Sequence, residues 1–263
     1  MRRTCSHHFR ERGLNEFETI DFRETDGDVR KFLEYSNEGY VLTDKIVRIV
    51  ETRPSFSILD VGRGEGYVIR KICSQVKQCT ALDPNQKMLE ILRSHVDKRC
   101  KVAFINNKFE DFETTEKFDI VLSSHTLSFF KDKQQAIKKM LFYTKKDGRL
   151  VLVLHCRASE QLQMLKDVFF AIKGKEINHI DAETLCTFLA DRGFDPKLDK
   201  VGTITKFPSV EIPLKLSYFL FRIGYNKLSE KSKLLIRSYL EGKRQNHFIE
   251  IRTLHGIITF RKN

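Results

Sequence analysis

The sequence lacks the long apolar segments of membrane proteins and secreted precursors. It has no apolar run of about 18 residues, which is the shortest that indicates a membrane-spanning helix. No apolar stretch follows the polar N-terminal residues Met1–His8, whereas a signal peptide carries an apolar core behind its first residues. We therefore expect a cytoplasmic protein that has no membrane partner.

The cysteines and histidines are not spaced like the ligands of a metal site. The six cysteines, at positions 5, 73, 79, 100, 156 and 186, include no CxxC pair and show no metal-like pairing with the eight histidines. Structural zinc sites usually show such closely spaced ligand pairs. We therefore expect no metal site, and we expect buried or surface thiols in a reducing compartment.

Acidic residues are fewer than basic ones. The 263 residues include 47 Lys and Arg against 35 Asp and Glu, which gives a net charge of +12. An excess of positive charge is typical of proteins that bind nucleic acid. The basic residues here are scattered in short clusters, however, which favours an ordinary solvated surface. The chain is long enough for one large domain, or for a core with additions, and we expect a monomer or a weak dimer.

One stretch has an unusual number of glycines. The apolar run Phe56–Val61 stops at Gly62, Gly64 and Gly66, and a helix-compatible segment follows over Tyr67–Val76. This order predicts a buried strand, a tight turn and a helix. Glycines there let the backbone approach a ligand, although a plain turn would also explain them. The spacing is neither that of a dinucleotide-binding loop nor that of a phosphate-binding P-loop.

An acidic residue ends the next predicted strand. Gln78–Leu82 stops at Asp83, which comes about 20 residues after the glycines, where a carboxylate can accept hydrogen bonds from both hydroxyls of a ribose. A simpler alternative is that Asp83 caps the helix that follows from Gln86. The glycine turn and this acid together fit a ligand with a ribose and a cationic centre.

The segments Leu59–Gly66 and Leu82–Met88 resemble the first two motifs of the class I S-adenosylmethionine-dependent methyltransferases. The resemblance implies S-adenosyl-L-methionine as the cofactor and a role in binding it for eight residues. These are Asp60, which orders the loop, Gly62 and Gly64 at the methionine part, Asp83 at the ribose, Met88, Phe109 and Glu110 at the adenine, and Ser124 facing the sulfur. Met88 is almost equally well explained as a core residue.

Strand-like and helix-like segments alternate along the rest of the chain. Further strands are predicted at residues 101–106, 118–123 and 149–155, and two more at 198–207 and 248–260. The alternation predicts a doubly wound, Rossmann-like α/β fold. We expect the seven-stranded methyltransferase sheet with an antiparallel edge, an N-terminal lid segment and a late helical insertion.

The expected organisation divides the chain into four parts. Residues 1–50 form an arm and a lid helix, of which the first 28 are charged, irregular and mobile. Residues 51–208 form the cofactor-binding core, 209–243 a two-helix insertion, and 244–263 the final strand. The insertion lies over the sheet and walls the acceptor pocket, or alternatively it forms a dimerising surface.

The end of the fourth strand bears on the acceptor. Ser123–Thr126 contains neither the Asn/Asp-Pro-Pro-aromatic tetrad of methyltransferases that act on base amines nor the Pro-Cys nucleophile of those that act on pyrimidine C5. We therefore predict methyl transfer to a nitrogen or oxygen of a small molecule. The alternatives are an RNA methyltransferase that uses the basic surface, and a non-catalytic cofactor-binding scaffold.

Segments outside the first two motifs resemble the histamine N-methyltransferase-like group of small-molecule methyltransferases. They are Arg30–Glu38, Phe129-Phe130 and the late insertion. The resemblance implies that Glu38 contacts the acceptor amine and that His125 lines the pocket. Arg252 stands where that group holds the amine with an asparagine, which suggests an acceptor that bears a carboxylate. The acceptor set is thus Glu38, Tyr35, His125, Phe129 and Arg252.

We predict that Glu38 lies in a lid over the acceptor together with the aromatic residues Phe32, Tyr35 and Tyr40. The alternative is an exposed acid at the start of a helix, with the aromatics packed against that helix. Catalysis mainly requires alignment of the acceptor with the methyl group. Glu38 or His125 would act as a weak base that accepts the acceptor's proton.

Overall fold

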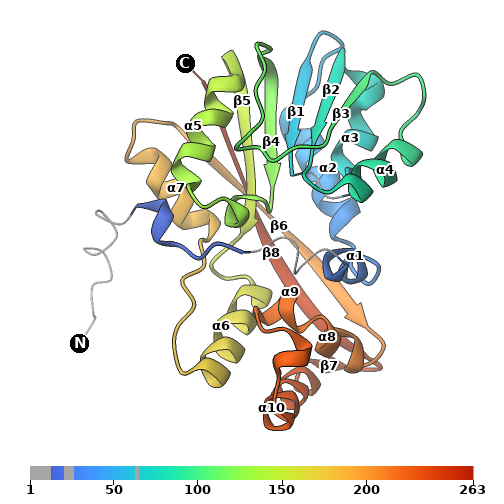
Figure 1. Ribbon diagram of the computed structural model, residues 1–263, viewed down its shortest axis with the longest axis vertical. Coiled ribbons are helices and arrows are strands. Elements are labelled where there is room, and N and C mark those ends of the chain that lie inside the picture. The colour runs from blue at the N-terminus through green and yellow to red at the C-terminus, as the bar shows by residue number, and fades with distance from the viewer. Residues whose placement is uncertain (1–12, 21–26, 63–64, 263) are drawn as a thin grey trace.

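The computed structural model describes residues 13–20, 27–62 and 65–262, and within them seven strands form one sheet in the order β3-β2-β1-β4-β5-β8-β6. The first five strands in the chain pair in parallel, and β8 runs antiparallel to both of its neighbours. The predicted seven-stranded Rossmann-like sheet is therefore confirmed (Figure 1). The strands are β1 Ser57–Val61, β2 Gln78–Leu82, β3 Val102–Ile105, β4 Phe118–Ser124, β5 Thr144–His155, β6 Lys197–Phe207 and β8 Phe248–Arg261, and the short β7 Arg244–Gln245 pairs with β8.

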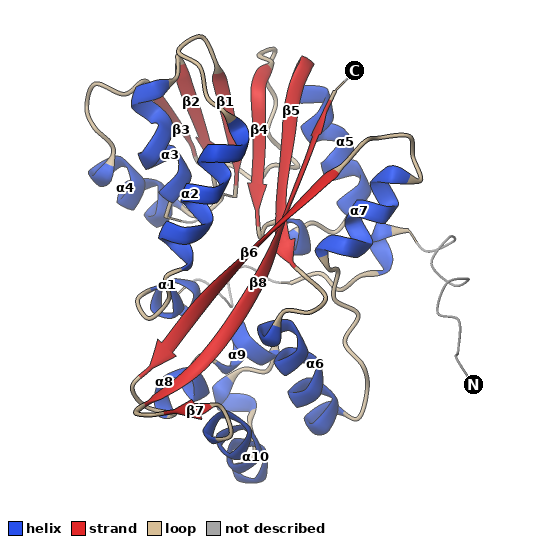
Figure 2. Cartoon of the chain, turned by 180° about the vertical axis from the view of Figure 1, so that it is seen from behind, coloured by secondary structure: helices blue, strands red, loops and turns tan. Residues whose placement is uncertain are grey.

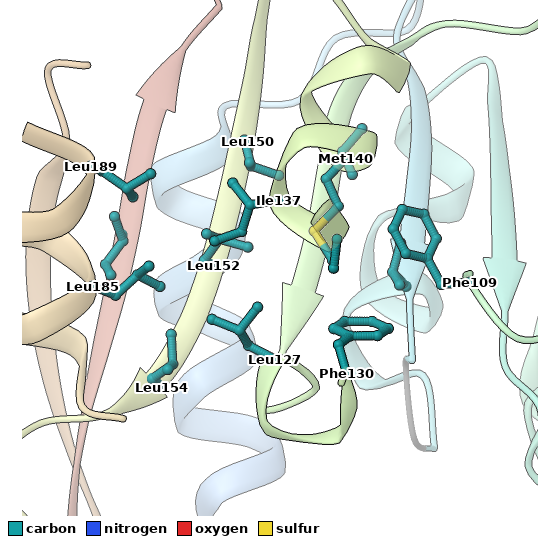
Figure 3. Close-up of a cluster of buried hydrophobic side chains, with 14 of the residues drawn as sticks. Phe109, Leu127, Phe130, Ile137, Met140, Leu150, Leu152, Leu154, Leu185 and Leu189 are labelled. Carbon is teal, nitrogen blue, oxygen red and sulfur yellow. The ribbon is translucent and has the colours of Figure 1, made fainter. Parts of the chain in front are cut away.

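Helices cover both faces of the sheet because successive strand residues point to opposite sides. On β5, Leu150, Leu152 and Leu154 belong to one buried cluster, and Val151 and Val153 belong to the other. Figure 3 shows the first cluster, in which the β5 leucines lie between helices α5 and α7. The helices are α1 Asp28–Leu33, α2 Glu38–Val50, α3 Tyr67–Ile72, α4 Gln86–His95, α5 Lys133–Tyr143, α6 Glu160–Lys173, α7 Ala182–Ala190, α8 Glu211–Lys215, α9 Ser217–Phe221 and α10 Glu230–Glu241.

Several predicted boundaries differ from the observed ones. The helix predicted from Tyr67 to Val76 ends at Ile72 and continues as a 3₁₀ turn over Cys73–Gln75. The fifth strand begins at Thr144 instead of Arg149, because the β4–β5 ladder resumes across an irregularity at its start. Helix ends are the least certain part of a periodicity argument, since apolar spacing marks a buried face and not the terminal residue.

The strands β6 and β8 extend beyond the rest of the sheet and carry a second group of helices (Figure 2). A separate apolar cluster forms there, with Ile249 and Ile251 of β8 packed among residues of α6, α8, α9 and α10. The prediction of a two-helix insertion is wrong, because the first predicted helix is divided into α8 and α9. Helix α9 then ends at Arg222, whose left-handed conformation (φ +59°) stops the helix.

The expectation of a mobile N-terminal arm is wrong for residues 13–20. Leu14, Phe17 and Ile20 are buried, and Leu14 and Phe17 belong to the cluster around α5. The ammonium of Lys133, itself fully buried, donates hydrogen bonds to the backbone oxygens of Phe17 and Phe130 (3.0 and 3.1 Å). A buried ammonium must be hydrogen-bonded to be tolerated, so this contact fixes the segment to the core. The predicted anchor Phe22 lies outside the described residues.

The cysteine prediction is also wrong for one pair. Cys73 and Cys100 form a disulfide, and their Cα atoms lie 5.4 Å apart, which is within the usual range. Residues 27 positions apart meet because Cys73 lies shortly before β2 and Cys100 shortly before β3, and these two strands are parallel neighbours. Cys79, Cys156 and Cys186 are free thiols. Among the described residues, no helix combines the length and apolar character that crossing a bilayer requires.

Candidate active site

A cavity of about 960 Å³ opens at the carboxyl ends of β1, β2 and β4, which is where open α/β sheets bind ligands. Its volume lies at the upper end of the range for small-molecule sites. Ten of the thirteen predicted site residues line it, namely Glu38, Asp60, Gly62, Asp83, Met88, Phe109, Glu110, Ser124, His125 and Phe129. The sheet thus brings together residues that are far apart in the sequence.

The turn after β1 packs closely against the turn after β4. Gly62 has a φ of +63°, and a Cβ atom added to it would lie 2.2 Å from Cγ2 of Thr126. The Thr126 hydroxyl lies within hydrogen-bond distance of the backbone oxygens of Val61 and Gly62. Only glycine fits at this position, and the two turns are held together as one wall of the cavity.

Asp83 is buried at the end of β2, with 7% of its surface exposed. One carboxylate oxygen, Oδ1, accepts a hydrogen bond from the backbone N–H of Asn85 (2.9 Å). Asn85, and not Asp83, caps α4, because its side chain accepts from the N–H of Lys87. The alternative that Asp83 serves as the helix cap is therefore wrong, and its carboxylate lies at the cavity instead.

The three residues predicted at the adenine differ in burial. Met88 is half-buried on the first turns of α4, and Glu110 is exposed. Phe109 is almost fully buried, and its ring packs against Phe130 and Tyr143. The side chain of Phe109 therefore belongs mainly to the core, and the loop backbone around it borders the cavity.

At the other end of the cavity, Glu38 lies beside a group of histidines. Its carboxylate oxygens are 3.8 Å from Nε2 of His125 and 3.8 Å from Nε2 of His255. His125 Nε2 is hydrogen-bonded to His255 Nδ1 (3.0 Å), and the centre of the His155 ring lies 4.8 Å from that of His125, with the two rings tilted by 44°. His125 has a φ of +55°, an uncommon backbone conformation for a residue with a side chain.

Burial determines the protonation states of Glu38 and of the histidines near it. It raises the pKa of Glu38 to about 7 and lowers the pKa of His125 to about 4. Burial also lowers the pKa of His179 to about 3, and it lowers the pKa values of His155 and His255 well below the usual range. The imidazoles are therefore neutral near pH 7, because a charged ring would lose its hydration.

Two predicted acceptor residues lie elsewhere. The ring of Tyr35 packs on Phe207 of β6 (5.3 Å), and its backbone oxygen accepts from Lys206, so this residue faces β6 and not the cavity. Arg252 is exposed and borders a separate hollow beside Glu160. Strand residues alternate between faces, so Arg252 and His255, three positions apart on β8, point to opposite sides.

Other predictions for this region have mixed outcomes. Phe32 lines the cavity, whereas Tyr40 is 72% exposed and packs against Tyr67, so two of the three aromatics do not cover the acceptor end. The alternative of an exposed Glu38 is also wrong, since Glu38 lines the cavity. Gly64 lies outside the described residues.

Sequence reasoning missed several residues at the acceptor end. His155, His179, Phe219 and Arg222 line the cavity, and the buried His255 lies behind them. His155 is the last residue of β5, and a polar residue at the end of a parallel strand was a usable signal. The sequence carried no comparable signal for the others, because they come from a loop, the insertion and an antiparallel strand.

A cationic side chain, Arg222, lines the cavity and follows α9. Its guanidinium donates hydrogen bonds to the backbone oxygens of Tyr218 and Phe219, while Nε is buried and has no hydrogen-bond partner in the described residues. Burial lowers the pKa of Arg222 to about 10, against the opposing charge of Glu18. The group stays charged near neutral pH and retains an unused donor.

The described residues fit S-adenosyl-L-methionine. Gly62 lets the backbone approach a ligand, and the buried Asp83 carboxylate presents acceptor oxygens for hydroxyl groups. Asp60 and Ser124 line the same cavity. The cavity also has room beyond these residues for a second molecule.

Comparisons with known proteins agree with this arrangement. A family model described as a methyltransferase domain matches residues 30–197. The uncharacterized methyltransferase YcgJ of Bacillus subtilis is 26% identical over 113 residues, which are 42% of this chain and 45% of that protein. A malonyl-[acyl-carrier protein] O-methyltransferase of Acetivibrio thermocellus is 23% identical over 225 residues, covering 72% of this chain and 79% of that enzyme.

The solved structure of the YcgJ protein has the same fold. It superposes with a TM-score of 0.61 at 17% identity and covers 84% of this chain and 97% of that one. None of these relatives is a histamine N-methyltransferase, so the expected likeness to that group finds no support among them.

Proposed function

Because the chain belongs to the methyltransferase-domain family and is a class I S-adenosyl-L-methionine-dependent methyltransferase, we propose that it methylates a nitrogen or oxygen of a small molecule. One observation carries the proposal. The cavity that holds the cofactor residues continues to a buried end formed by Glu38, His125 and Arg222. The Acetivibrio relative is by name an O-methyltransferase, which supports oxygen as one acceptor type.

In the proposed mechanism the protein mainly binds and orients. S-adenosyl-L-methionine, when bound, supplies a methyl group on a positively charged sulfur. Asp83 and the Gly62 turn would bind the ribose and methionine parts of the cofactor, and Ser124 directly precedes His125 of the acceptor end. Holding the reacting groups in line contributes up to roughly 7–11 kcal/mol in model systems. A Glu38 carboxylate oxygen accepts the proton that the acceptor's N–H or O–H group must lose.

Arg222 narrows the class of acceptor. A guanidinium that stays charged and lines the cavity favours a carboxylate or another acid group. The proposed acceptor therefore carries an acid group together with a hydroxyl or amine. We still propose an acceptor that bears a carboxylate, but we assign the binding of that carboxylate to Arg222 and not to Arg252.

Replacing Arg222 with methionine tests this assignment. Loss of a charged hydrogen bond costs about 1.5–3 kcal/mol, which is about ten- to a hundredfold in KM for an acceptor with an acid group. The matched control is Arg30→Met, at a residue that also lines the cavity but is 59% exposed in its pair with Glu65. An equal fall in turnover for acceptors with and without the acid group would contradict the assignment.

The proposed function is tested with radiolabelled S-adenosylmethionine and a cell extract divided by size. We expect the label in the small-molecule fraction, unchanged after nuclease treatment. Label confined to a nuclease-sensitive fraction would instead establish the RNA methyltransferase alternative. Many basic side chains are already paired with acids, as in Lys45–Asp199, Lys200–Glu183 and Lys206–Glu250, which weakens the case for an RNA surface.

A further inference from the structure

We propose that His125, His155 and His255 bind a divalent transition-metal ion such as Zn²⁺ at the acceptor end of the cavity. One ligand nitrogen from each of the three rings lies within 4.8 Å of the others. The proposal departs from our expectation of no metal site, which rested on the spacing of the cysteines. The cluster could not be seen in the sequence because its members are 30 and 100 residues apart.

Three adjacent strands bring the imidazoles together. His125 directly follows β4, and its backbone N–H donates to the oxygen of Val153 on β5 (2.9 Å). His155 ends β5 and is paired in register with His255 of the antiparallel β8. The sheet therefore places His155 and His255, and His125 is fixed to it by the residue that ends β4 and by this hydrogen bond to β5.

Hydrogen bonds orient His255 as a ligand. Its Nε2 lies 2.8 Å from the hydroxyl of Thr203 on β6, and its Nδ1 faces Nε2 of His125 at 3.0 Å. When Nε2 of His255 carries the proton and donates to Thr203, Nδ1 accepts a hydrogen bond from Nε2–H of His125, and a bound ion would take the place of this shared proton. Histidines that bind metals generally donate their second ring N–H to such a partner.

The spacing is close to that of a tetrahedral site. Zn–N bonds of about 2.0–2.1 Å place tetrahedral nitrogens roughly 3.4 Å apart. The His125–His255 pair is slightly closer than this, at 3.0 Å, and the widest separation in the cluster is 4.8 Å. Binding of one ion therefore requires the hydrogen-bonded His125–His255 pair to open slightly and the His155 ring to turn inward, and both His125 and His155 are only partly buried and line the cavity.

The surroundings suit an ion that binds the acceptor. The Glu38 carboxylate, 3.8 Å from His125, supplies negative charge next to the cluster. Three protein ligands leave a fourth position open, which is typical of catalytic and not of structural zinc sites. That position would take a hydroxyl or carboxylate oxygen of the acceptor. This last step alone rests on the proposed function.

Metal content is the direct test. The full chain, purified without a histidine tag and stripped with a chelator, is dialysed against Zn²⁺ and its metal content is measured by mass spectrometry. We expect a single tightly held ion per chain. Replacement by Co²⁺ should give the visible absorption bands of a tetrahedral site. Metal below one ion per two chains, or a Co²⁺ spectrum like that of the aqueous ion, would overturn the proposal.

Variants identify the ligands. Since second-sphere changes alone cost 10–100-fold in metal affinity, His125→Asn and His155→Gln should each cost about a hundredfold or more, and Thr203→Val about tenfold. Asparagine is used at position 125 because it tolerates a positive φ. The matched control is His179→Gln, at a histidine that lines the same cavity outside the cluster. Affinity unchanged in His125→Asn and His155→Gln would refute the site.

Binding of S-adenosylhomocysteine, measured on every variant, separates the two proposals. A variant that binds the cofactor product normally is folded, so loss of metal in it reports on the ligands. Failure to bind S-adenosylhomocysteine in the unaltered protein would instead contradict the proposed function and leave the metal result standing. Methyl transfer to each acceptor, with and without the ion, is then measured separately.

Discussion

The variant Asp83→Asn is expected to bind S-adenosyl-L-methionine about tenfold more weakly or worse, because an unmade buried hydrogen bond costs about 1–3 kcal/mol. A carboxylate accepts from two hydroxyls at once, whereas an amide has one acceptor oxygen. That oxygen can still accept from the N–H of Asn85, so the turn into α4 stays intact. Isothermal titration with S-adenosylhomocysteine measures the effect.

The control for Asp83 is Asp97→Asn, which makes the same change of charge. Asp97 lies after α4, away from the cavity, and its carboxylate is paired with Arg99. We expect its cofactor affinity to match that of the unaltered protein. If Asp83→Asn and Asp97→Asn bind equally well, the ribose assignment of Asp83 fails.

The variant Glu38→Gln is expected to lower kcat/KM for the acceptor by about a hundredfold or more, since a positioned proton acceptor contributes 10²–10⁴-fold. Glutamine has nearly the same shape but cannot take a proton. Cofactor affinity should stay the same, because Glu38 lies at the acceptor end, beside His125 and His255. Steady-state kinetics and cofactor titration together give the two quantities.

Glu65→Gln is the matched control for Glu38. Glu65 lines the same cavity, and its carboxylate pairs with Arg30 at 3.7 Å, not with the histidines. We expect little change in kcat/KM for this variant. Joint loss of cofactor binding and turnover in Glu38→Gln would place Glu38 in the structural scaffold, and the proposed role would be wrong.

Much of the fold and of the cofactor end could be predicted from the sequence. In a parallel sheet, an apolar run that stops at a polar or glycine residue marks both a strand and its carboxyl end. Those ends meet at one edge of the sheet. Gly62 after β1, Asp83 after β2 and Ser124 at the end of β4 were found in this way, and all of them line the cavity. For these residues, the local sequence pattern that marks a strand end also determines that the residue lies at the cavity.

The acceptor end could be predicted only in part. Glu38 and His125 line the cavity as expected, but Tyr35 and Arg252 were assigned to a pocket that neither of them lines. Tyr35 is held against β6 by pairing of the neighbouring Ser36 with Thr205. Such a contact between residues 169 positions apart leaves no mark in local periodicity.

The sequence by itself determined the order of strands and helices and the residues that end the parallel strands, because both follow from local apolar patterns. Only the tertiary structure decided which residue of β8 faces the cluster. That strand is antiparallel, so its contribution comes from mid-strand, where register and not sequence position selects His255 over Arg252. The burial that shifts the pKa values of Glu38 and His125 likewise arises only when α2, β4 and β8 meet.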